Sequence, residues 1–253
     1  MLSKLTATME NSVFLLPEYR VGPYTMQVFP ATRDMFHDKR RVLEHDWTAG
    51  VAYIAQHLST RKALECLMRS LVTCIHYRSG LNSRSDEESF THSFATGLVE
   101  LARNNPEFWT QFNQLLEQEY KPRAGWGRTA AGNPVAAALT NPKHLMFDGR
   151  GCAIEWIPGH KWKEPGAYGF YLIKKGHIEL NDAIHGTNRP LVALHEVLHF
   201  LHECVGLKSS TDETTFKRGQ AYTFLRFIQQ NPKFWAWWLH AVRPEVTEMP
   251  LAA

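Results

Sequence analysis

The sequence predicts an α+β protein made of two related units, each a small sheet followed by a helix pair, that pack pseudo-symmetrically. Three observations carry this prediction: a repeat with an offset of 126 residues, short aromatic runs typical of strands, and longer segments with helix start and stop residues. The chain has 253 residues, 44% of them hydrophobic, and a net charge of +3. This composition excludes bulk disorder, and so small a charge argues against a dedicated nucleic-acid binder.

The repeat defines the domain organisation. Residues 76–109 align with 202–235 without a gap, and 12 of the 34 positions are identical, which is far more than unrelated sequences give. The clearest blocks pair GLNSRSDEESF with GLKSSTDETTF, and NPEFW with NPKFW. Between the copies lies a stretch rich in Gly, Ala and Pro, typical of a linker. We therefore expect a first unit at 1–120, a linker at 121–142 and a second unit at 143–253.

The first unit is expected to begin with a strand at 24–29, because YTMQVF is aromatic and β-branched. A helix follows at about 62–78, and Gly80 stands where a left-handed residue ends a helix. Ser85 is the expected N-cap of the next helix, before the acidic first turn DEE. This helix ends at about Asn104, since the Asn-Pro that follows disfavours helical backbone, and a short aromatic packing helix comes next.

The second unit is expected to follow the same plan. AYGFYLI (167–173) and GHIEL (176–180) are the predicted strands, and a helix runs over about 189–204. Thr211 is the expected N-cap of the next helix, which ends at about Gln230 before a second Asn-Pro. An aromatic packing helix again closes the unit.

The second unit carries a motif with chemical meaning, His195-Glu196-Val197-Leu198-His199, inside an apolar helical segment. Residues four apart lie on one face of a helix, so His195 and His199 can present two imidazoles to a single ion. Glu196 flanks the same point and can accept a proton from water there. The pattern H-E-x-x-H therefore predicts a metal site with a general base beside it.

A catalytic zinc site usually has three protein ligands and an open position for water. Glu213, 14 residues after His199 and in the first turn of the next helix, is the predicted third ligand, with Asp212 as the alternative. His202 is a poor candidate, because it lies about 10.5 Å along the helix axis from His195. We expect His202 to have a structural role instead.

The first unit lacks this motif. At the offset of 126, Arg69, Ser70 and Thr73 stand opposite the two histidines and the glutamate. A guanidinium is always protonated and cannot replace imidazole as a ligand. The first unit is therefore expected to be a metal-free copy that packs against the second, shapes a groove or binds a partner.

The order of strand, H-E-x-x-H helix, Gly-Leu turn, acid-led helix and Asn-Pro stop resembles small gluzincin-like metallopeptidases common in phage and prophage genomes. The resemblance covers about 176–232 and is carried by GHIEL, LVALHEVLHFLHECVGL, DETTF and QQNP. It implies Zn²⁺ bound by His195 and His199 with Glu213, and Glu196 as the general base.

The sequence thus predicts a zinc-dependent hydrolase, a metallopeptidase acting on a peptide or protein substrate. We expect neither a membrane segment nor specific nucleic-acid binding, and a location in the cytoplasm of a bacterial or phage-infected cell. The alternative is a phage-type binding or inhibitory protein that acts on a host protein and holds zinc only structurally. The two predictions differ in whether Glu196→Gln abolishes the effect of the protein.

Overall fold

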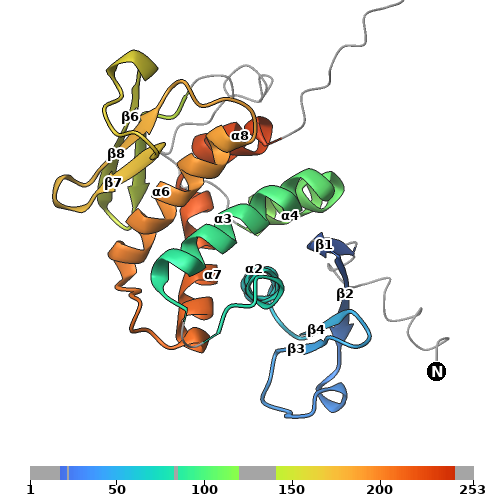
Figure 1. Ribbon diagram of the computed structural model, residues 1–253. Helices are drawn as coiled ribbons and strands as arrows, with labels where there is room; N and C mark the ends of the chain where they lie inside the picture. The colour runs from blue at the N-terminus through green and yellow to red at the C-terminus, as the bar shows by residue number, and fades with distance from the viewer. Residues whose placement is uncertain (1–17, 22, 83–84, 120–140, 243–253) are drawn as a thin grey trace, which may run out of the picture.

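The protein has an α+β fold with two four-stranded sheets, each followed by helices (Figure 1). The structure is a computed structural model that describes residues 18–21, 23–82, 85–119 and 141–242. Nearly all of the predicted linker, 121–142, lies outside the described residues. The expected α+β class and the order of sheet before helices are confirmed.

The first sheet has the strand order β1-β2-β4-β3. Its strands are β1 (Tyr19–Val21), β2 (Tyr24–Ala31), β3 (Leu43–Asp46) and β4 (Val51–Ala55). The central pair, β2 and β4, is parallel, and both outer pairs are antiparallel. Only β2 was predicted from the sequence, as 24–29.

The second sheet has the order β5-β6-β8-β7, again with a parallel central pair and antiparallel outer pairs. Its strands are β5 (His144–Phe147), β6 (Arg150–Ile157), β7 (Gly169–Leu172) and β8 (His177–Asn181). The strand β7 lies within the predicted run 167–173, and β8 extends one residue beyond the predicted run 176–180, whereas β5 and β6 were not predicted.

The two parallel pairs also share a register. In the first sheet Gln27 is paired with Val51, and in the second Ala153 is paired with His177. Each residue of the second pair stands 126 positions after its counterpart in the first, which is the offset of the sequence repeat. The hydrogen-bond register of the sheets therefore follows the same offset as the helical blocks.

In the described part of the chain three helices follow each sheet, and the bounds of the first two in each set agree closely with the expected ones. They are α2 (Thr60–Arg78), α3 (Glu87–Asn104) and α4 (Pro106–Glu119), then α6 (Asn188–Val205), α7 (Glu213–Gln230) and α8 (Pro232–Ala241). Short 3-10 segments lie at Arg33–Met35, Gly159–Lys161 and Ile173–Lys175. Gly206 has the expected left-handed conformation at the end of α6, with φ of 73°.

The predicted N-caps Ser85 and Thr211 were each wrong by one residue. Asp86 caps α3 and Asp212 caps α7, each accepting a hydrogen bond from the backbone N–H three residues on, at 2.8 and 3.0 Å. The hydroxyls of Ser85 and Thr211 instead accept from the backbone N–H three residues back. Both residue types suit an N-cap, so the local turn decides between them.

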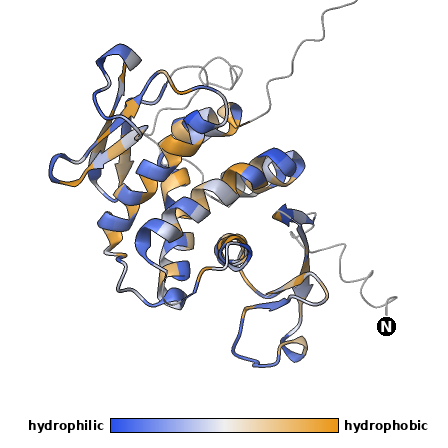
Figure 2. Cartoon of the chain, viewed as in Figure 1, coloured by the Kyte–Doolittle hydropathy of each residue, from blue (hydrophilic) through white to orange (hydrophobic). Residues whose placement is uncertain are grey.

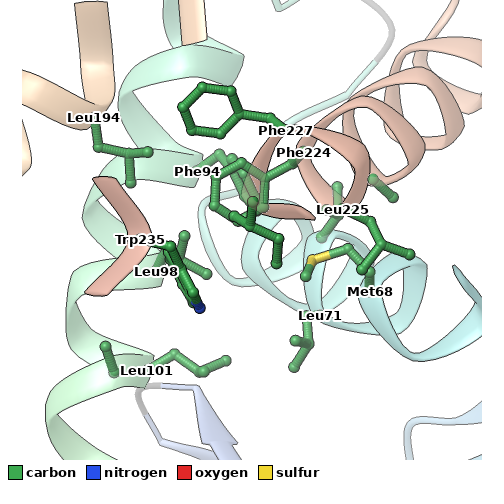
Figure 3. Packing of buried hydrophobic residues seen from close by; sticks show 14 of the residues in the cluster. Met68, Leu71, Phe94, Leu98, Leu101, Leu194, Phe224, Leu225, Phe227 and Trp235 are labelled. Atoms are coloured by element: carbon green, nitrogen blue, oxygen red, sulfur yellow. The ribbon is translucent and has the colours of Figure 1, made fainter. Parts of the chain in front are cut away.

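The helices of the two halves pack across each other: α3 lies against α6, and α2 lies against α7. Figure 2 shows that these helices carry both hydrophilic and hydrophobic residues. The hydrophobic ones meet in one continuous core that includes Met68 of α2, Phe94 of α3, Leu194 of α6 and Phe224 of α7 (Figure 3). In the described part of the chain, no helix is long and apolar enough to cross a membrane.

Candidate metal centre

Helix α6 places the two histidines of the motif at the surface of the core. The motif's apolar residues Val197 and Leu198 are buried, so the helix is anchored by the face that carries them. His195 and His199 lie on the side that faces α3, with their Nε2 atoms 3.0 Å apart. The predicted juxtaposition of two imidazoles is therefore present.

The carboxylate that joins them comes from the other half of the chain. Glu88, in the first turn of α3, has one oxygen 3.2 Å from His195 Nε2 and the other 3.2 Å from His199 Nε2. Among the described residues, these three form the group whose ligand atoms lie close enough together to hold a metal ion. The Glu88 side chain is 62% exposed, so the point where the three converge is open to water.

The spacing of these atoms suits a small metal ion. Ligands about 2.0 to 2.1 Å from a tetrahedral ion are separated from one another by roughly 3.3 Å. The contacts of 3.0, 3.2 and 3.2 Å are within a few tenths of an ångström of that value. Two imidazoles and one carboxylate are also a ligand set found in catalytic zinc sites.

The predicted third ligand lies elsewhere. Glu213 is the first residue of α7, and its Oε1 is 2.8 Å from Nζ of Lys217 on the same helix. The alternative, Asp212, caps that helix with its carboxylate. Neither residue belongs to the group formed by the described His, Cys, Asp and Glu side chains around the histidine pair. Packing explains the difference, because α3 and not the start of α7 covers the histidine face of α6.

Glu87, the neighbour of Glu88, lies close to two histidines. Its Oε2 lies 3.2 Å from Nδ1 of His199, and its Oε1 lies 2.5 Å from Nδ1 of His202. Burial would raise the pKa of Glu87, but the hydrogen bonds from the two histidines hold it well below its usual range. An ionised carboxylate only accepts hydrogen bonds, so a His199 that bound a metal through Nε2 would keep its proton on Nδ1, the atom that faces Glu87.

His202 has the structural role that the sequence predicted for it. It is only 2% exposed, its ring packs on Phe216, and its Nδ1 donates to Glu87. It contributes to the site indirectly, by holding the carboxylate that orients His199. Thr91 donates a further hydrogen bond to Glu87 at 2.8 Å.

Glu196, the predicted general base, is buried next to the metal-binding group. Only 7% of it is exposed, and burial raises its pKa to about 7 against the opposing effect of His199. The Glu196 side chain faces Gly169 of the edge strand β7. A side chain at position 169 would crowd it, because a Cβ there would lie 3.0 Å from the Cγ of Glu196. The glycine thus lets β7 approach α6 and pack against the Glu196 side chain.

The corresponding residues of the first half form a different arrangement. Ser70, at the position of Glu196, is fully buried, and its hydroxyl lies 2.7 Å from both Tyr19 Oη and His45 Nε2. Arg69 and Thr73, at the positions of the two histidines, offer no metal ligand. The expectation that this half holds no metal by itself stays a prediction, but its Glu88 reaches the site of the other half.

Sequence reasoning therefore missed Glu87 and Glu88. The expectation that each unit forms its own site led to a search for the third ligand only downstream of the histidines. The acidic run Asp86-Glu87-Glu88 could have indicated them, because it stands in the half that lacks the H-E-x-x-H motif. Comparisons with known protein families, curated proteins and solved structures found no match to this chain.

Proposed function

We propose that the protein is a zinc-dependent hydrolase, and specifically a metallopeptidase acting on peptides or proteins. The observation that carries the proposal is the convergence of His195, His199 and Glu88 beside the buried carboxyl of Glu196. Three protein ligands with one exposed side are typical of a catalytic zinc, whereas structural zinc sites have four protein ligands.

The residues divide the chemistry between them. A zinc ion held by the three ligands would acidify water and polarise a substrate carbonyl. Glu196, next to His195 in the chain, would accept a proton from the attacking water and return it to the leaving amine. Glu87 keeps the His199 ring in the orientation that presents Nε2.

We further propose that the two halves are copies of one unit and pack pseudo-symmetrically. The shared strand order, the common offset of 126 in both register and sequence, and the reciprocal packing of α3 on α6 and α2 on α7 support this. In this arrangement each site is composite, because the first helix of one half meets the second helix of the other. The metal site then needs both halves.

The test combines elemental analysis with cleavage of a mixed peptide library by the purified full chain. We expect bound zinc and cleavage in the wild type, zinc without cleavage in Glu196→Gln, and neither in the His195→Ala/His199→Ala variant. Glu213→Gln is the matched control and should retain both properties. Undiminished cleavage by Glu196→Gln would refute the role of this base, and zinc without any cleavage in the wild type would favour a structural metal.

A further inference from the structure

A small pocket lies on the surface of α3, beginning one helical turn after the candidate metal ligand Glu88. Its volume of about 280 Å³ is below the range of pockets that enclose whole small-molecule ligands, so it suits a single side chain. The end of α2 and the middle of α3 line it with six residues, five of them polar or charged: Arg78, Ser79, His92, Ser93, Thr96 and Gly97.

His92 connects the pocket to the metal centre. It stands four residues after Glu88 on α3, and its ring lies 6.2 Å from the ring of His195. Along the axis of α3, His92 and Thr96 are about 6 and 12 Å from Glu88. An extended peptide advances about 3.3 Å per residue. A peptide that runs along α3 with its scissile bond at the metal would therefore bring a side chain about two to four residues away to this pocket.

The hydroxyl groups that line the pocket have no partner in the described part of the chain. Oγ1 of Thr96 is buried without a hydrogen bond, and the hydroxyls of Ser79 and Ser93 form none with the described residues. Buried polar groups are nearly always paired, in many cases with water or a ligand. The free hydroxyls thus indicate that a polar group fills this pocket.

The charges around the pocket favour an uncharged occupant. Nη2 of Arg78 donates to Glu100 at 2.8 Å, so the charge of this arginine is already paired. Arg78 is the last residue of α2 and Ser79 is its C-cap, and the partial negative charge of a helix C-terminus disfavours an anion. A carboxylate in the pocket would meet both Glu100 and this helix end. A primary amide has no charge, and it both donates and accepts hydrogen bonds, as hydroxyls do.

We propose that this pocket is a specificity subsite for the side-chain amide of a glutamine or asparagine in the substrate. The unpaired hydroxyls of Ser93 and Thr96 recognise the amide, and the small volume of the pocket excludes larger groups. As a substrate subsite it rests on the proposed peptidase function. The binding of the amide itself needs neither a metal nor turnover, so it can be measured separately.

The first test is an NMR titration of the metal-free full chain with N-acetylglutamine amide and, in parallel, with the leucine and glutamate analogues. We expect saturable shifts at Ser93 and Thr96, at lower concentrations of the glutamine compound than of the other two. Thr96→Val keeps the shape of the side chain and should weaken this binding about 5-fold, the effect of one hydrogen bond between neutral groups. Ser93→Leu should abolish it by filling the pocket. Thr110→Val, at an exposed position on α4, is the matched control and should bind as the wild type does.

Cleavage of the mixed peptide library is the second test. We expect a preference for glutamine or asparagine at one position about two to four residues from the cleaved bond. Thr96→Val should remove this preference without slowing the cleavage of peptides that have alanine at that position. Binding of the glutamine compound by a wild type that cleaves no peptide would support the pocket and count against the hydrolase. Absence of saturable binding, binding of the leucine or glutamate compound as tight as that of glutamine, or unchanged binding by Thr96→Val would overturn the proposal.

Discussion

Replacing Glu88 by Gln tests whether the metal site is shared between the two halves. The change keeps the size of the side chain and removes the charge of the one carboxylate that contacts both Nε2 atoms, at 3.2 Å each. The two imidazoles would remain 3.0 Å apart and could still bind an ion, but with two ligands in place of three. We therefore expect weaker metal binding in a folded protein.

The magnitude can be bounded from the contacts. Loss of a group that only orients a ligand typically lowers metal affinity by about 10- to 100-fold. Glu88 is already placed to contact the metal directly. Removing its charge should therefore lower the metal affinity by more than about 100-fold, which corresponds to roughly 2.7 kcal/mol of binding free energy. Glu88→Asp shortens the side chain by one carbon–carbon bond, about 1.5 Å, and should also weaken binding because the carboxylate no longer spans the gap.

The assay is a competition titration of zinc between the protein and a chromophoric chelator. Glu213→Gln is the matched control, because it removes an acid from the equivalent first turn of α7, and its affinity should equal that of the wild type. Circular dichroism of each variant checks that the fold is retained. A large loss of affinity in Glu213→Gln together with wild-type affinity in Glu88→Gln would refute the composite site and favour a ligand from the same half.

Two further predictions concern Glu87, beside the candidate metal ligands, and the half-buried His45 of the first half. Glu87→Gln should lower zinc affinity about 10- to 100-fold without abolishing binding, since it only orients His199, and the same chelator competition measures it; wild-type affinity would contradict the orienting role. The pKa of His45 is lowered to about 4, mainly by burial. His45 therefore stays neutral in the folded protein until the pH approaches 4, whereas in the unfolded chain it is protonated below about pH 6.5. Stability should therefore fall as the pH drops from 6.5 towards 4 and be unaffected above 6.5, with a loss from this residue of about 2 kcal/mol at pH 5. Urea unfolding of metal-free wild type and His45→Gln at pH 5 and 7 measures the difference, and parallel pH dependences in the two proteins would contradict it.

The helices of this protein were predictable because their signals are local. The ends of α3 and α7 follow from Asn-Pro, and Gly206 ends α6, so residue types within a few positions determine where each helix stops. Most strands were not predictable in this way. The strand β4 reads VAYIA and β5 reads HLMF, short segments without a clear alternation, and they become strands by pairing with β2 and β6. Their structure depends on partners that the local sequence does not indicate.

The candidate metal ligands differ in the same way in how far apart they lie in the sequence. His195 and His199 were predictable because a helix brings residues four apart together. Glu88 is more than 100 positions away in the sequence, and it reaches them only because α3 packs on α6. No spacing rule within one half could identify it, and the choice of Glu213 followed from assuming that the ligands come from a single half.

The proposed duplication nevertheless makes the composite site visible in the sequence. Suppose that each half formed its own site: the second half would then have both histidines but Thr214 at the position of the carboxylate ligand, and the first half would have Glu88 but no histidine. Each site would be incomplete in a different way. If the ligands are instead grouped across the halves, His195, His199 and Glu88 form one complete set, and Arg69, Thr73 and Thr214 form a set in which all three ligands are absent. One site kept in full and one lost in full is the simpler outcome, because a metal site that has lost one ligand no longer gives its remaining ligands a function.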